Sequence, residues 1–127
     1  MAEKSPPLRV LVVDDELLIR WSIAETLSGA GHSVVQAADG ASAIQALTAP
    51  AERIDAVILD YRLPDSNDFT LLARIRQLAP TSPVVLVTAH GSPEITKGAL
   101  DLGASAVMSK PFDLRELADV LVKACKM

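Results

Sequence analysis

The chain has 127 residues, half of them apolar and only 3% aromatic, which is enough for one domain with an aliphatic core. Its 12 basic and 16 acidic residues give a net charge of −4, and no Lys/Arg cluster points to a nucleic-acid-binding surface. The single cysteine, Cys125, excludes an intramolecular disulfide. We find neither a signal-peptide core nor an apolar stretch of the roughly 20 residues that span a bilayer. We therefore expect a soluble cytoplasmic protein, with Cys125 as a small apolar residue on a helix.

Short β-branched runs alternate along the chain with helical patterns. The predicted strands cover residues 8–13, 33–38, 55–60, 83–89 and 105–109. The predicted helices begin at residues 16, 40, 69, 93 and 114. Because each strand is apolar almost throughout, we expect a parallel sheet with helices on both faces. The pattern predicts one α/β domain over residues 8–125, preceded by a disordered tail at 1–7.

Several helix starts carry a polar residue that can accept hydrogen bonds from the first turn. These predicted N-caps are Asp15, Asp39, Ser92 and Asp113. Pro93 suits the first helical position, and Glu116 completes an acidic variant of the capping box with Asp113.

Polar residues also gather where the predicted strands end. Asp14 and Asp15 follow the first strand, and Asp60 ends the third. Thr88 lies at the end of the fourth strand, and Lys110 follows the fifth. Ligands of open parallel sheets bind beyond the carboxyl ends of the strands, so we expect these side chains at one site. Three carboxylates with one lysine suit Mg²⁺, which takes oxygen ligands and often binds phosphate oxygens.

Each of these residues has an ordinary structural interpretation when it is taken alone. Asp15 is then a helix N-cap, and Asp60 caps the following turn. Lys110 is then a solvated surface charge, and Thr88 is a β-branched strand residue. Their coincidence at one edge of the sheet is what favours a functional site.

The segments "VVDDE", "ILDYRLP", "VTAHG" and "MSKPF" resemble the receiver domain of two-component response regulators. The resemblance runs from about Leu8 to Lys123, and "AHGSPEIT" with "KPFD" is most similar to receivers of the NtrC type. It implies a CheY-like, flavodoxin-like (βα)5 doubly wound sheet with strand order 2-1-3-4-5. It also implies that Asp60 accepts a phosphoryl group from a histidine kinase in a Mg²⁺-dependent reaction.

The resemblance implies a set of metal ligands. Asp15 and Asp60 would bind Mg²⁺ directly, and Asp14 would act mainly through water. The backbone carbonyl of Arg62 would add a further ligand. The paired aspartates are then tolerated because a cation is their partner.

The resemblance also assigns the residues around the phosphoryl group. Asp60 would be the nucleophile, with Lys110 and Thr88 stabilising the phosphoryl oxygens. The small Ala89 would leave room for the phosphoryl group. A cis bond between Lys110 and Pro111 would aim the lysine inward.

A domain of this kind is a switch that catalyses only its own phosphorylation and dephosphorylation. The implied output face combines the helix from residue 93, the strand at 105–109 and the helix from residue 114. That face is a candidate homodimer surface, and it is expected to act on a downstream output domain or protein.

Two positions depart from the family pattern. Val107 stands where the family usually has a Tyr or Phe that swings inward on activation. Either the route to the output face is altered, or movement of the fourth helix carries the signal alone. Asp68 replaces a usual Gly, so we expect the turn to form with some strain. Asp65 and Asp68 also add negative charge near the mouth of the site.

Arg62 and His90 lie two residues beyond Asp60 and Thr88. The resemblance places both beside the phosphoryl group, where large side chains would hinder an attacking water. We therefore hypothesise that they lengthen the phosphorylated lifetime.

Other functions fit the sequence less well. The main alternative is an atypical receiver that binds proteins without being phosphorylated, which Val107 and Asp68 favour. A Mg²⁺-dependent phosphatase with an aspartyl nucleophile would need Asp-x-Asp after the first strand. A nucleotide-binding flavodoxin-like protein would need a Gly-rich loop there, and "VVDDE" supplies neither motif.

Overall fold

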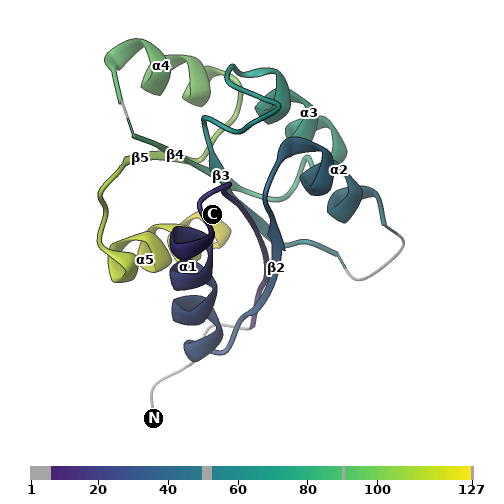
Figure 1. The fold of residues 1–127 in the computed structure, drawn as a ribbon, viewed down its shortest axis with the longest axis vertical. Helices are drawn as coiled ribbons and strands as arrows, with labels where there is room; N and C mark the ends of the chain where they lie inside the picture. Colours follow the sequence, from purple (N-terminus) through teal and green to yellow (C-terminus); the bar gives the residue numbers. More distant parts are fainter. Residues whose placement is uncertain (1–6, 50–52, 90, 127) are drawn as a thin grey trace.

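The computed structural model describes residues 7–49, 53–89 and 91–126, and its parallel strands form one sheet (Figure 1). The strands are β1 (Arg9–Val13), β2 (Ser33–Ala37), β3 (Ala56–Asp60), β4 (Val84–Thr88) and β5 (Ala106–Ser109). Their order, β2-β1-β3-β4-β5, confirms the predicted topology. Each strand is one or two residues shorter than its predicted range.

Valine, isoleucine and leucine side chains make β1, β3 and β4 the buried centre of the sheet. Every residue of β3 and β4 is buried, as is every residue of β1 after Arg9. The edge strands β2 and β5 are partly exposed, because each has a neighbour on one side only. Burial on both faces, predicted for all the strands, therefore holds only for the central three.

Helices cover both faces of this sheet, as predicted. They are α1 (Leu17–Gly29), α2 (Gly40–Thr48), α3 (Thr70–Leu78), α4 (Pro93–Asp101) and α5 (Leu114–Cys125). On one face, Ile23 of α1 and Leu117 of α5 belong to one apolar cluster, the α1/α5 core. On the other face, Leu72 of α3 and Ala99 of α4 belong to a second cluster, the α2–α4 core. Figure 1 shows this division of the helices between the two faces.

The helix starts show which predicted caps form. The side chains that accept first-turn hydrogen bonds, as predicted, are those of Asp39, Ser92 and Asp113. The cap predicted for Asp15 is wrong. Helix α1 begins after Glu16, whose N–H donates to Asp14 Oδ1 at 2.8 Å. The N-cap residue is Glu16, one position later than predicted, and its side chain makes no capping hydrogen bond.

The loop between β3 and α3 carries Asp65 and Asp68, and it differs from expectation at Asp68. No described residue other than glycine has a positive φ angle, so the strain expected at Asp68 is absent. Asp68 instead accepts a hydrogen bond from the N–H of Thr70 at 2.9 Å, which lowers the pKa of its carboxyl. Asp65 accepts hydrogen bonds from the first N–H groups of α2, including that of Gly40 at 2.8 Å. Its charge therefore stabilises the start of that helix.

The remaining expectations concern the ends of the chain, His90 and the cysteine. Residues 1–6 of the predicted tail, and His90, lie outside the described residues. Cys125 is partly buried against the α1/α5 core, as predicted, and burial raises the pKa of its thiol. No helix in the described part of the chain has the length and apolar character needed to cross a membrane.

Candidate functional site

Four neighbouring strands deliver the polar side chains that the sequence singles out. Asp14 follows β1, and Asp60 is the last residue of β3. Thr88 is the last residue of β4, and Lys110 follows β5. Because these strands are parallel and adjacent, their carboxyl ends meet at one edge of the sheet. The structure brings Asp14, Asp60 and Lys110 into contact, and it places Thr88 at the end of the strand between β3 and β5.

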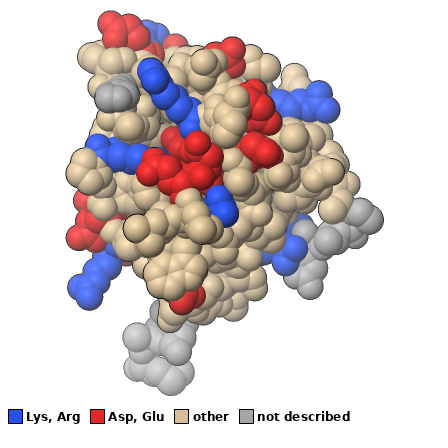
Figure 2. Space-filling view, viewed as in Figure 1, with Lys and Arg blue, Asp and Glu red and all other residues tan. Residues whose placement is uncertain are grey.

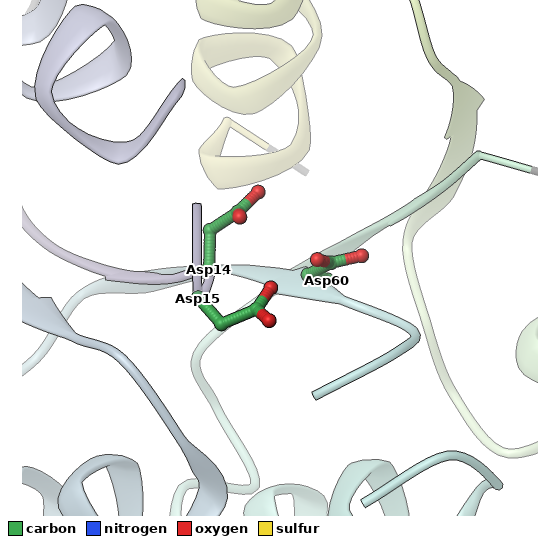
Figure 3. Close-up of side chains that lie close together, drawn as sticks. All are labelled: Asp14, Asp15 and Asp60. Atoms are coloured by element: carbon green, nitrogen blue, oxygen red, sulfur yellow. The ribbon is translucent and has the colours of Figure 1, made fainter. Parts of the chain in front are cut away.

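Asp14, Asp15 and Asp60 form a carboxylate cluster at this edge. One oxygen atom from each residue lies within 4.8 Å of the other two. Figure 3 shows the three side chains at the ends of two neighbouring strands, with Asp15 turned toward Asp60. Asp14 and Asp60 are buried, whereas Asp15 is exposed. Hard oxygen donors this close together fit Mg²⁺, and without a cation their charges repel one another.

Lys110 supplies positive charge to the cluster. Its Nζ lies 3.0 Å from Asp14 Oδ2 and 3.3 Å from Asp60 Oδ2. The Lys110–Pro111 peptide bond is cis, as the resemblance implies. Figure 2 shows acidic side chains gathered near the middle of this face of the molecule, with basic side chains beside them.

Burial and charge set the protonation of the cluster. Burial and the neighbouring charge of Asp14 raise the pKa of Asp60 to about 6, against the opposing effect of Lys110. Burial alone would lower the pKa of Lys110. Its hydrogen bonds and charge attraction to Asp14 and Asp60 outweigh that effect and raise the pKa above its ordinary value. At pH 7 the pair is therefore an ionised carboxylate and a protonated amine.

Thr88 and Ala89 lie at the boundary of the site, at the end of β4. Thr88 is buried, and its carbonyl accepts a hydrogen bond from the N–H of Lys110 at 2.8 Å. Ala89 is exposed. The backbone bond holds together the two residues that the resemblance assigns to the phosphoryl oxygens, and the methyl group of Ala89 adds little bulk beside them.

Arg62 lies on the loop after β3, beside the carboxylate cluster. Its backbone N–H lies 3.4 Å from Asp60 Oδ1, and its side chain is exposed. The role of its carbonyl as a metal ligand stays a prediction.

Two residues of the site are not indicated by the sequence pattern. Glu16 Oε1 lies 3.4 Å from Lys110 Nζ, and Arg20 donates from Nη1 to the carbonyl of Asp14 at 2.7 Å. The one available signal for Glu16 is its position directly after the paired aspartates. Its partner is 94 residues away, so the contact depends on the sheet order.

Comparison with known proteins connects this geometry to a family. Residues 10–122 match the family model described as the response regulator receiver domain. The chain belongs to the response regulator receiver family. The DNA-binding transcriptional regulator NtrC of Escherichia coli (strain K12) is 34% identical over 115 residues, which are 91% of this chain and 24% of NtrC. Sporulation initiation phosphotransferase F of Bacillus subtilis (strain 168) is 32% identical over 115 residues, 91% of each chain.

Solved receiver structures agree with the assignment. A CheY-like receiver domain protein from Methanospirillum hungatei JF-1 superposes with a TM-score of 0.87 at 27% identity, covering 95% of both chains. Receiver domains serve phosphorylation-dependent signalling as phosphoacceptors, bind Mg²⁺ at an acidic pocket, and interact with histidine kinases and output domains. The chain thus spans about a quarter of NtrC but most of the sporulation phosphotransferase.

Proposed function

We propose that Asp60 of this receiver domain accepts a phosphoryl group from the phosphohistidine of a sensor histidine kinase. The observation that carries the proposal is the position of Lys110, 3.3 Å from Asp60 Oδ2 and 3.0 Å from Asp14 Oδ2. An ammonium fixed beside a carboxylate nucleophile is placed to stabilise charge on the transferred phosphoryl oxygens.

In the proposed transfer, a carboxylate oxygen of Asp60 attacks the phosphorus atom. A P–O bond forms while the P–N bond to the donor histidine breaks. The electron pair of the P–N bond stays on the imidazole, which leaves as a neutral ring when its other nitrogen carries a proton. Lys110 and Thr88 donate hydrogen bonds to the phosphoryl oxygens, and Ala89 leaves room for them.

Mg²⁺ is the cation that fits the carboxylate cluster, and when bound it neutralises charge on the phosphoryl oxygens. Asp15 and Asp60 would hold it directly, Asp14 through water, and Arg62 through its carbonyl. Asp15 is exposed, and the N–H of Glu16 donates to Asp14 rather than to Asp15. Both observations support Asp15 as a direct ligand of the cation.

The same site would also reverse the modification. A water molecule attacks the phosphorus and forms a new P–O bond while the P–O bond to Asp60 breaks. Asp60 returns to a carboxylate, inorganic phosphate leaves, and the proton that the water loses goes to a phosphate oxygen or to solvent. Arg62 and His90 would restrict the approach of that water and lengthen the phosphorylated lifetime.

We propose that residues 8–125 form the receiver domain and that α4, β5 and α5 form its output face. This face would act on an output domain or protein, or on a second copy of the chain. The unit would work in the cytoplasm without direct contact to nucleic acid.

The second candidate is an interaction module that keeps the fold without using phosphate. Val107 favours it, because its partly buried side chain packs against the α2–α4 core where the family usually places an aromatic ring. A valine cannot make the inward ring movement that the family uses.

Locating the phosphoryl group distinguishes the two candidates. The chain is incubated with acetyl phosphate and Mg²⁺ and then reduced with borohydride, which converts an aspartyl phosphate to homoserine. Peptide mass spectrometry is expected to find homoserine at position 60 and unchanged aspartates at positions 14 and 15. No conversion, in a chain that still binds Mg²⁺, would favour the interaction module.

A further inference from the structure

Lys110 has a third carboxylate partner, Glu16, to which the proposed phosphotransfer gives no role. Its Nζ lies 3.4 Å from Glu16 Oε1, the longest of its three contacts with carboxylates. The side chain of Glu16 is 59% exposed, against 3% for Asp14 and 7% for Asp60. An ammonium has three N–H donors, so three carboxylates can engage all of them.

A phosphoryl oxygen on Asp60 needs one of these donors. Asp60 loses its carboxylate charge when it is phosphorylated, so its bond to Lys110 passes to the phosphoryl group. As the ammonium moves toward that group, the bond to Asp14 or to Glu16 must weaken. Removing the partner of a buried carboxylate strongly destabilises the protein, whereas an exposed ion pair contributes little to stability. Glu16 has both the longest contact and the most exposed side chain, so it is the partner that separates at the lowest cost.

We infer that Glu16 is a positioning residue that holds Lys110 in the unphosphorylated domain and releases it to the phosphoryl group. The inference rests on the proposed function. Glu16 then competes with the phosphoryl group for Lys110, and losing the competitor should speed phosphorylation.

The surroundings of Glu16 permit this exchange. Glu16 and Lys110 line the same cleft of about 490 Å³, between the start of α1 and the segment 110–114. The carboxylate can turn from the ammonium into solvent without moving another element. The support that Glu16 gives to Asp14 comes from its backbone N–H at 2.8 Å, so substitutions of the side chain leave that bond in place.

The first test is the rate of phosphorylation of the whole chain by acetyl phosphate with Mg²⁺, followed by intact-protein mass spectrometry. Glu16→Gln is expected to raise the second-order rate constant about two- to fivefold, the range for a partly exposed ion pair. Glu16→Asp keeps the charge but shortens the side chain, and it is expected to give a similar rise. Asp68→Asn is the matched control, because it removes an exposed charge while asparagine can retain the bond to Thr70. It is expected to change the rate less.

Two further measurements show whether Glu16 acts through Lys110. In a Lys110→Gln background, Glu16→Gln is expected to change the phosphorylation rate no more than Asp68→Asn does. In the metal-free, unphosphorylated chain, the ¹⁵N NMR signal of the Lys110 Nζ is expected to shift in Glu16→Gln and stay in place in Asp68→Asn.

The inference is overturned if Glu16→Gln and Asp68→Asn raise the rate by the same factor, or if the rise persists without Lys110. An unmodified wild-type chain would instead overturn the proposed function. The NMR comparison would still report on the contact between Glu16 and Lys110 in that case.

Discussion

Lys110 Nζ and Asp60 Oδ2 lie 3.3 Å apart, although 50 residues separate them in the chain. They meet because β3 and β5 flank β4 in the sheet and end at the same edge. Asp14 joins them from β1, on the other side of β3. The pairing places one partly buried cation between two buried carboxylates, and the predictions below depend on it.

Replacing Lys110 by glutamine separates its two effects on the site. Phosphorylation is expected to slow by about 10²-fold or more, because one stabilising partner of the phosphoryl oxygens is lost. Mg²⁺ is expected to bind more tightly, because a positive charge leaves the carboxylate cluster. Mass-spectrometric time courses measure the first effect and isothermal titration calorimetry the second.

The control for this substitution is Lys97→Gln. Lys97 is an exposed lysine of α4 that pairs with Asp101, so neither quantity is expected to change. Slower phosphorylation of Lys110→Gln together with weaker Mg²⁺ binding would indicate a damaged site and would contradict this prediction.

Mg²⁺ binding is expected to depend on pH through Asp60. The pKa of Asp60 is raised to about 6, so its carboxyl is protonated below that pH and ionised above it. Since the metal needs the ionised carboxylate, the affinity is expected to fall by about tenfold per pH unit below 6 and to level off near 7. Calorimetry from pH 5 to 8 measures this, with Asp60→Asn expected to bind weakly and to lack the step near pH 6. Equal wild-type affinity across the range would contradict the raised pKa.

Gly98 of α4 lies against the ring of Phe69. An added Cβ would come 2.6 Å from Cε2 of that ring, which also packs on Tyr61 at a centroid distance of 5.4 Å. Gly98→Ala is therefore expected to lower the free energy of unfolding by about 1–2 kcal/mol, since overpacking outweighs the gain in helix propensity. Urea denaturation measures the change.

Gly29 of α1 offers a matched comparison, because a Cβ added there meets nothing within 4 Å. Gly29→Ala is expected to raise the free energy of unfolding by about 0.5 kcal/mol, through helix propensity and a more restricted unfolded chain. Equal effects at the two glycines would show that α4 does not pack tightly on Phe69.

Replacing Arg62 and His90 together by alanine is expected to shorten the phosphorylated lifetime a few-fold. Smaller side chains would leave more room for the water that attacks the phosphoryl group. The decay is followed by intact-protein mass spectrometry after the phosphodonor is removed. Arg53→Ala serves as the control, because Arg53 is exposed and binds Thr81. An unchanged decay in the double variant would refute the hypothesis.

Much of the fold and of the site could be predicted from the sequence. The central strands β1, β3 and β4 are continuous apolar runs, which only a buried parallel sheet accommodates well. The end of each run is marked by a polar residue, and the carboxyl ends of parallel strands share one edge. Asp14, Asp60, Thr88 and Lys110 could therefore be grouped without knowledge of side-chain positions.

The partners of some individual side chains could not be predicted from the sequence. Asp15 does not cap α1, because the N-cap residue is Glu16, whose N–H donates to Asp14. Asp65 accepts a hydrogen bond from the N–H of Gly40, 25 residues earlier in the chain, a contact that the local sequence does not indicate. Asp68 stabilises the turn by accepting a hydrogen bond from the N–H of Thr70, and the turn needs no positive φ angle.

Intact-protein mass spectrometry after incubation with acetyl phosphate and Mg²⁺ tests the role of Asp60 most directly. The wild-type chain is expected to gain the mass of one phosphoryl group. Asp60→Asn and a sample treated with EDTA are expected to gain none. A wild-type chain that binds Mg²⁺ but stays unmodified, or an Asp60→Asn variant that gains the same mass, would contradict Asp60 as the phosphoacceptor.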